Sequence, residues 1–148
     1  EVGRVVGTPI VQDGLLYVGD LGGTLHCLDA ATGDHVWKHE TNGAIWGCLA
    51  LAGDRLYVGN VDGGLTVLRA GRRKELLARM EMEAPLYSRP ALVGDALYLA
   101  TANRLYLIAA TGLNPVSQDK QSMPSLAVGK AETSLEGDTA RNREREHR

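Results

Sequence analysis

Two aromatic residues and an arginine have the spacing of a ligand-binding site. Trp46 and Tyr87 stand at matching places in a pattern that repeats about every forty residues, and Val6 takes that place one repeat earlier. Arg89 follows Tyr87 by two residues, so both side chains share one face of an extended strand. Aromatic faces stack on flat or sugar-like groups, and a guanidinium clamps a carboxylate or phosphate. Trp46, Tyr87 and Arg89 are therefore our candidate ligand or partner site, although packing between repeats explains the two rings equally well.

The histidines and cysteines lack the spacing of a metal or redox centre. They are His26, His35, His39, His147, Cys27 and Cys48. His35 and His39 are four residues apart, a spacing that does not converge on a metal ion from a strand, so we interpret both as surface residues. His26 and Cys27 alternate on an expected strand and are interpreted as packing residues. No geometry supports a disulfide between Cys27 and Cys48.

Four aspartates stand beside glycines in expected turns: Asp20, Asp29, Asp62 and Asp95. A carboxylate in such a turn commonly accepts hydrogen bonds from backbone amides, and we interpret all four as turn caps. Calcium is not expected at them, because no loop spaces three oxygen ligands together. The sequence also lacks a Ser/His/Asp arrangement and a phosphate-binding loop. We therefore assign no catalytic, cofactor-binding or metal-binding residue.

Composition excludes some classes of partner. The 148 residues carry a net charge of −2, and the repeats contain no dense run of Lys or Arg, which argues against nucleic acid. No apolar stretch approaches the roughly 20 residues that span a bilayer. The two cysteines fit neither a disulfide scaffold nor a structural zinc site. The chain begins Glu1-Val2-Gly3 without a recognisable signal segment, so the residues alone leave the compartment open.

A repeat of about forty residues predicts the fold. Tyr17-Val18-Gly19 recurs as Tyr57-Val58-Gly59 and again as Tyr98-Leu99-Ala100. Each repeat divides into short β-type runs separated by glycine-rich turns, and its middle runs are apolar at nearly every position. Such strands need cover on both faces, which stacked four-stranded sheets provide. The prediction is an all-β partial β-propeller of about three antiparallel blades.

The blades are expected over residues 5–39, 45–82 and 86–110, within a repeat region 1–112. Their inner strands are expected at 5–11, 45–51 and 86–93. The third blade has no recognisable outer strand after Ala109 and is predicted to be incomplete. Residues 113–148 are polar and contain no aromatic residue, which predicts a disordered tail, with a short helix over 139–147 as the alternative. A ring needs about 4–8 blades, so we expect further blades upstream or self-association of several copies.

The segment from Cys27 to Trp37 resembles the tryptophan-docking motif of PQQ-like propeller repeats, Ala-x-Asp-x-x-Thr-Gly-x-x-x-Trp, with Cys27 in the alanine place. Asp29, Thr32, Gly33 and Trp37 match its defining positions. Repeat two keeps only Arg69-Ala70-Gly71 and places Leu77 where Trp37 would fall, and repeat three keeps Ala110-Thr111-Gly112. The resemblance covers about residues 5–112. Kelch and WD40 propellers fit less well, because kelch repeats are longer and the Gly-His and Trp-Asp signatures are missing.

The resemblance implies two alternative functions. BamB-like members are scaffolds that bind a protein or polymer partner, which is our preferred interpretation, and their location implies the periplasm or another extracytoplasmic compartment. Quinoprotein dehydrogenases instead bind PQQ and calcium through axial acidic residues and a disulfide between adjacent cysteines. The expected inner strands contain no Asp or Glu, and the chain has no Cys-Cys pair. PQQ and calcium therefore enter only under the second interpretation, with the active-site residues in upstream sequence.

Overall fold

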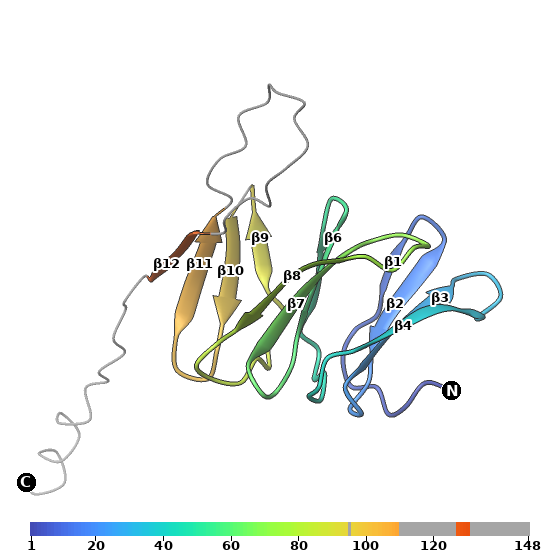
Figure 1. Cartoon of the computed structure of the whole chain (residues 1–148), viewed down its shortest axis with the longest axis horizontal. Helices are drawn as coiled ribbons and strands as arrows, with labels where there is room; N and C mark the ends of the chain where they lie inside the picture. The colour runs from blue at the N-terminus through green and yellow to red at the C-terminus, as the bar shows by residue number, and fades with distance from the viewer. Residues whose placement is uncertain (95, 110–126, 131–148) are drawn as a thin grey trace, which may run out of the picture.

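The computed structural model describes residues 1–94, 96–109 and 127–130, and its elements there are all β-strands. Three four-stranded antiparallel sheets stand side by side (Figure 1). Blade 1 contains β1 (Ile10–Gln12), β2 (Leu15–Gly19), β3 (Thr24–Asp29) and β4 (His35–Glu40). Blade 2 contains β5 (Leu49–Ala52), β6 (Arg55–Gly59), β7 (Gly64–Arg69) and β8 (Leu76–Glu81). Blade 3 contains β9 (Ala91–Val93), β10 (Ala96–Ala100), β11 (Leu105–Ala109) and β12 (Ala127–Lys130). The predicted architecture of propeller blades is confirmed.

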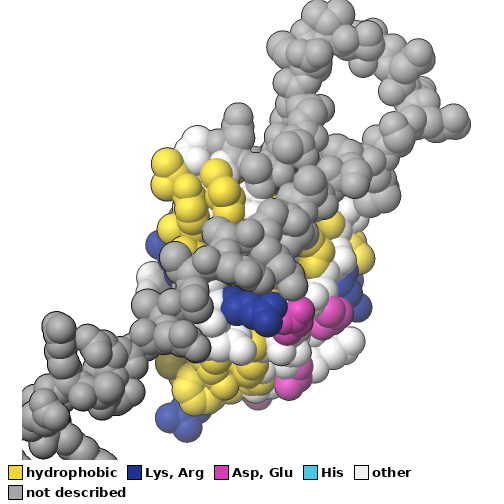
Figure 2. Space-filling model, turned by 90° about the vertical axis from the view of Figure 1, so that its left-hand side faces the viewer, with side chains coloured by type: hydrophobic (Ala, Val, Ile, Leu, Met, Phe, Trp, Pro, Cys, Tyr) yellow, Lys and Arg dark blue, Asp and Glu magenta, His cyan; other side chains and the backbone are white. Residues whose placement is uncertain are grey.

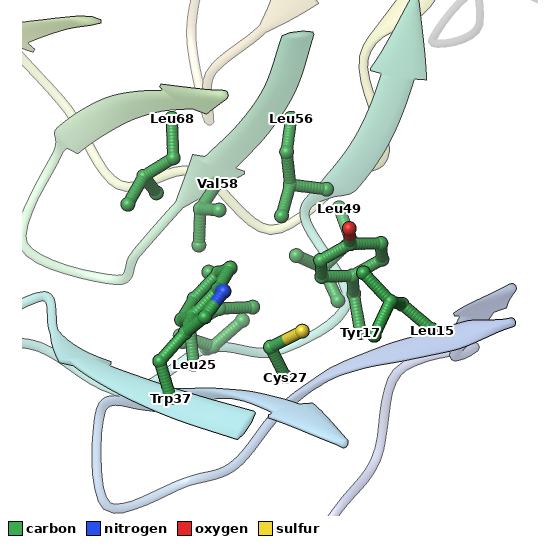
Figure 3. Close-up of a cluster of buried hydrophobic side chains, with 10 residues drawn as sticks. Leu15, Tyr17, Leu25, Cys27, Trp37, Leu49, Leu56, Val58 and Leu68 are labelled. Carbon is green, nitrogen blue, oxygen red and sulfur yellow. The ribbon is translucent and has the colours of Figure 1, made fainter. Parts of the chain in front are cut away.

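The hydrophobic core lies between the sheets. One cluster joins Leu25, Cys27 and Trp37 of blade 1 to Leu56 and Val58 of blade 2 (Figure 3). A second cluster joins blades 2 and 3, with these buried members: Cys48, Leu65, Leu86, Leu97, Leu99, Tyr106 and Ile108. The middle strands of blade 2 thus bury apolar side chains on both faces, as their continuous apolar sequence predicts. Blade-on-blade packing therefore forms the hydrophobic core.

Blade 3 presents the equivalent face to solvent. Tyr98 takes the place of Tyr17 and Tyr57, yet its side chain is 36% exposed, whereas Tyr17 is 1% exposed. Leu105, in the place of Leu25 and Leu65, is 46% exposed. Figure 2 views the molecule from the third-blade side and shows hydrophobic side chains on either side of charged ones. The side chains of Tyr98 and Leu105 are thus exposed at positions that face a neighbouring blade in repeats one and two.

The predicted absence of a fourth strand in blade 3 is wrong. Residues 127–130 form β12, which pairs antiparallel with β11 from Tyr106↔Lys130 to Ala109↔Ala127. The strand is short, contains Gly129 and is far from β11 in sequence, so no local pattern marks it. Its backbone groups complete the ladder at the outer edge of β11, which explains why the strand forms there. The predictions for 113–126 and 131–148, including the helix over 139–147, lie outside the described residues.

The inner strands are shorter than predicted, because the segments before them bond to the neighbouring blade. The amide of Ile45 donates to the carbonyl of Asp20 at 3.0 Å, and the amide of Leu86 donates to the carbonyl of Asn60 at 3.0 Å. These groups lie at equivalent places in successive repeats. The residues that precede β5 and β9 therefore act as inter-blade connectors, and the ladder of each sheet begins only at Leu49 and Ala91.

A β-bulge that blades 1 and 2 share changes which residues of their outer strands are equivalent. The register shifts between Cys27 and Leu28 in blade 1 and between Val67 and Leu68 in blade 2, so each outer strand carries one extra residue. Trp37 pairs with Cys27, and the residue that pairs with Val67 is Ala78. The structural equivalent of Trp37 in blade 2 is therefore Ala78 rather than the predicted Leu77.

Candidate functional site

The aromatic pair of the candidate site is formed in the structure. The ring centroids of Trp46 and Tyr87 lie 6.0 Å apart, with an angle of 68° between the ring planes, which is an edge-to-face contact. Each side chain is 51% exposed, and Val6 at the matching place in blade 1 is 55% exposed. All three residues lie in the connectors before the inner strands rather than on the strands. They present one exposed apolar position per blade, which we call the connector row.

Arg89 lies in the same connector as Tyr87. Its side chain is exposed, and the following Pro90 is buried. Trp46 and Tyr87 are therefore in contact in the structure. Arg89 follows Tyr87 by two residues in the same connector. Half-exposed rings retain a large free face for stacking, and an exposed guanidinium is free to bind an anion. These side chains are therefore chemically able to stack on a flat group and to bind an anion.

The tryptophan-docking motif holds the first two blades together. The carboxylate of Asp29 accepts hydrogen bonds from the amides of Ala31 at 3.0 Å and Thr32 at 3.3 Å, which closes the turn. Gly33 adopts a φ of 79°, a conformation that disfavours residues with a Cβ. The turn leads the chain into β4, and Trp37 on β4 is only 9% exposed. The motif is therefore a structural device that aims Trp37 at blade 2.

A clamp on Gly71 completes this docking. The indole Nε1 of Trp37 donates to the carbonyl of Gly71 at 2.8 Å, and the amide of Gly71 donates to the Tyr17 hydroxyl at 2.8 Å. Arg72 forms an ion pair with Asp29 at 2.6 Å. The hydrogen bond from Arg72 is the main reason that the pKa of Asp29 is lowered, and the hydrogen bonds from the two turn amides contribute less. The role of Tyr17 is not evident from the sequence, although its recurrence as Tyr57 and Tyr98 is a visible signal.

The two cysteines are buried thiols in different core clusters. Burial raises the pKa of Cys27 to about 11 and that of Cys48 to about 12. Both thiols are therefore protonated at neutral pH and are poor nucleophiles and poor metal ligands. The interpretation of Cys27 as a packing residue agrees with this position.

A buried hydrogen-bonded chain runs from Asp20 to the surface. Nε2 of His26 lies 2.9 Å from Oδ2 of Asp20, and Nδ1 of His26 lies 3.1 Å from Nε2 of His35. The other carboxylate oxygen of Asp20 accepts the amide of Thr24 at 2.9 Å, which is the predicted turn cap. Burial alone would raise the pKa of Asp20, but its hydrogen bonds from His26, Thr24 and Gly3 outweigh burial and hold that pKa below its usual value.

Asn60 takes the place of Asp20 in blade 2. Its Oδ1 accepts the amide of Gly64 at 2.7 Å, and its Nδ2 donates to the carbonyl of Thr41 at 2.7 Å. The turn therefore accepts either an aspartate or an asparagine, and the carboxylate in blade 1 has a further partner in His26. The sequence predicts a packing role for His26 and a surface position for His35, and it contains no signal for the contact between them. Asp95 and His147 lie outside the described residues.

The fold matches solved structures of β-propeller proteins. A quinohemoprotein alcohol dehydrogenase from Pseudomonas putida matches with a TM-score of 0.63 and 23% identity over 74% of this chain and 19% of its own. BamB from Moraxella catarrhalis matches with a TM-score of 0.59 and 20% identity over 71% of this chain and 33% of its own. At these identities the two structures show the fold alone.

The amino-acid sequence is also similar to sequences of these two kinds of protein. A quinohemoprotein alcohol dehydrogenase from Comamonas testosteroni is 32% identical over 83 residues, which cover 49% of this chain and 12% of the relative. The chain thus spans only a small part of that protein. A family model described as outer membrane protein assembly factor BamB matches residues 2–131, which include all three blades and β12. The chain therefore belongs to this PQQ-like, BamB-type family of β-propeller repeats.

Proposed function

We propose that this chain is the blade-forming region of a longer β-propeller protein that serves as a non-catalytic scaffold for a protein or polymer partner. The matching family is described as an assembly factor. The chain covers 33% of the BamB structure, and Tyr98 and Leu105 of blade 3 are exposed at positions that face a neighbouring blade in repeats one and two. Further blades or further copies of the chain would cover these side chains and close the ring.

The connector row is the observation that carries the binding role. Large apolar side chains normally turn into the core, yet Trp46, Tyr87 and Val6 are half-exposed at equivalent positions of three successive blades. Aromatic residues and arginine dominate the energetics of protein interfaces. Trp46, Tyr87 and Arg89 supply both kinds of residue along one line of connectors. The family relationship favours an extracytoplasmic compartment for this binding, and the described residues contain no helix long and apolar enough to cross a membrane.

Substitution of the aromatic pair tests this binding role. The test uses the longer protein that contains this chain, together with the protein partner that co-purifies with it. Changing Trp46 and Tyr87 together to alanine should weaken binding by about 30-fold or more, because the loss of even one interface hot spot costs about 2 kcal/mol. Isothermal titration calorimetry gives the dissociation constant.

Val93→Ala is the matched control for this test. Val93 is 65% exposed on β9, so its truncation should leave both binding and the melting temperature unchanged. Equal affinity of the control and the double variant would contradict a binding role for the connector row.

A second candidate is part of a quinoprotein-like dehydrogenase, which the identity of 32% to such an enzyme favours. The residues present do not match the group that this function requires. The inner strands β1, β5 and β9 carry no acidic side chain that would hold calcium, and Cys27 and Cys48 belong to separate core clusters. Under this candidate, the residues that hold PQQ and calcium lie elsewhere in the longer protein.

Reconstitution separates the two candidates. Incubation of this chain with PQQ and calcium, followed by dye reduction with alcohols or aldose sugars, should give only the background rate, because its inner strands supply no acidic ligand. The same assay on the longer protein should also remain at background if the protein is a scaffold. Saturable turnover by the longer protein that disappears on chelation would favour the dehydrogenase instead.

A further inference from the structure

The facing ring nitrogens of His26 and His35 have a separation that suits two ligands of one metal ion. Their facing nitrogens, Nδ1 and Nε2, are 3.1 Å apart, and the ring centroids are 5.3 Å apart. Two imidazole nitrogens bound to one ion at about 2.0–2.1 Å lie about 2.9–3.4 Å from each other in square-planar or tetrahedral geometry. The observed distance falls within that interval. We therefore propose that His26 and His35 bind a divalent transition-metal ion of the copper and zinc class at the surface of blade 1.

Asp20 fixes the tautomer of His26 that this site requires. Its carboxylate accepts a hydrogen bond at Nε2 of His26, so in the neutral ring the proton resides on Nε2 and the lone pair on Nδ1. Nδ1 is the atom that faces His35. A metal-bound histidine usually donates its second ring N–H to a carboxylate, which fixes the ring and increases its basicity. Asp20 is thus a positioning residue for the metal ligand.

The surroundings permit entry of an ion but limit the number of ligands. His26 is 2% exposed, whereas His35 is exposed, so one side of the pair is open to solvent. In the described part of the chain, no three His, Cys, Asp or Glu side chains are grouped to hold a metal. Water therefore completes the coordination.

The identity of the ion follows from the ligands. Imidazole nitrogen suits copper, zinc and nickel, whereas calcium and magnesium prefer oxygen. With two imidazoles and water, Cu²⁺ should bind most tightly, followed by Ni²⁺ or Zn²⁺. Lys38 pairs with His26 across the β3–β4 ladder, and its positive charge opposes a cation there, while the charge of Asp20 offsets it.

Metal titration of the untagged full chain tests this site. Calorimetry with CuCl₂ at pH 7.5 should show one site, and electron paramagnetic resonance should show nitrogen coupling from two imidazoles. His35→Gln should weaken Cu²⁺ binding at least tenfold. His39→Gln is the matched control on the same strand, and it should bind Cu²⁺ as the wild type does. Equal affinity in the wild type and His35→Gln, or an equal loss in His39→Gln, would overturn the proposal.

Asp20→Asn tests the positioning role. Asn60 shows that the equivalent turn accepts asparagine, so the fold should be retained. An amide N–H facing Nε2 of His26 moves the ring proton to Nδ1 and blocks the ligand atom. Cu²⁺ affinity should therefore fall about 10–100-fold in a chain that circular dichroism shows to be folded. Unchanged affinity in a folded Asp20→Asn chain would show that the carboxylate does not orient the ligand.

Discussion

Replacement of Trp37 by alanine should lower the free energy of unfolding by about 3–5 kcal/mol. The indole fills the space between blades 1 and 2 and touches Tyr17 with ring centroids 5.9 Å apart. Its removal leaves a cavity and also frees the carbonyl of Gly71 from its hydrogen bond. Urea denaturation followed by circular dichroism measures the loss without depending on tryptophan fluorescence.

Two further variants identify the cause of that loss. Trp37→Phe keeps an aromatic ring but cannot donate to Gly71, so it should recover most of the packing and lose about 1 kcal/mol through the hydrogen bond. Trp46→Ala removes the other, half-exposed tryptophan and should change the unfolding free energy by no more than about 1.5 kcal/mol. Equal costs for Trp37→Ala and Trp46→Ala would show that the docking motif does not hold the blades together.

Substitution of Gly59 by alanine should destabilise the protein by about 1–3 kcal/mol, although only one methyl group is added. A Cβ at this position would lie 2.4 Å from Sγ of Cys48 and 2.9 Å from Cδ1 of Leu86. These atoms belong to the buried cluster between blades 2 and 3, which has no room to move aside. The unfolding free energy from chemical denaturation, compared with that of the wild type, measures the effect.

The third repeat provides the matched control for Gly59. Ala100 takes the equivalent place on the exposed face of blade 3, where a Cβ is tolerated, and Ala100→Gly should cost no more than about 1 kcal/mol. In the double variant Gly59→Ala with Cys48→Ala, loss of the sulfur makes room for the methyl group. The combined cost should then be smaller than the sum of the two single costs. If the cost of the double variant equals the sum of the two single costs, a clash with Cys48 is not the cause of the destabilisation.

The repeat pattern alone determined the blades, because its signals are local. Apolar runs and glycine-rich turns specify a strand within a few residues, and the order Asp29, Thr32, Gly33, Trp37 specifies a turn followed by a large ring. The contact of Trp46 with Tyr87 was also predictable in part, since equivalent positions of adjacent blades come together. Their place in the connectors was not, because backbone bonds to the preceding blade delay the start of the sheet ladder.

Only the tertiary structure determined the features that join distant residues. β12 owes its existence to the free edge of β11, and its own sequence carries too weak a preference to reveal it. The contact of His26 with His35 depends on the register of β3 against β4, in which one extra residue brings His35 opposite Leu28. The need for glycine at Gly59 depends on Leu86 of the following blade. Sequence patterns report local preference, whereas register and close packing are set by the whole fold, which is why these features became visible only in three dimensions.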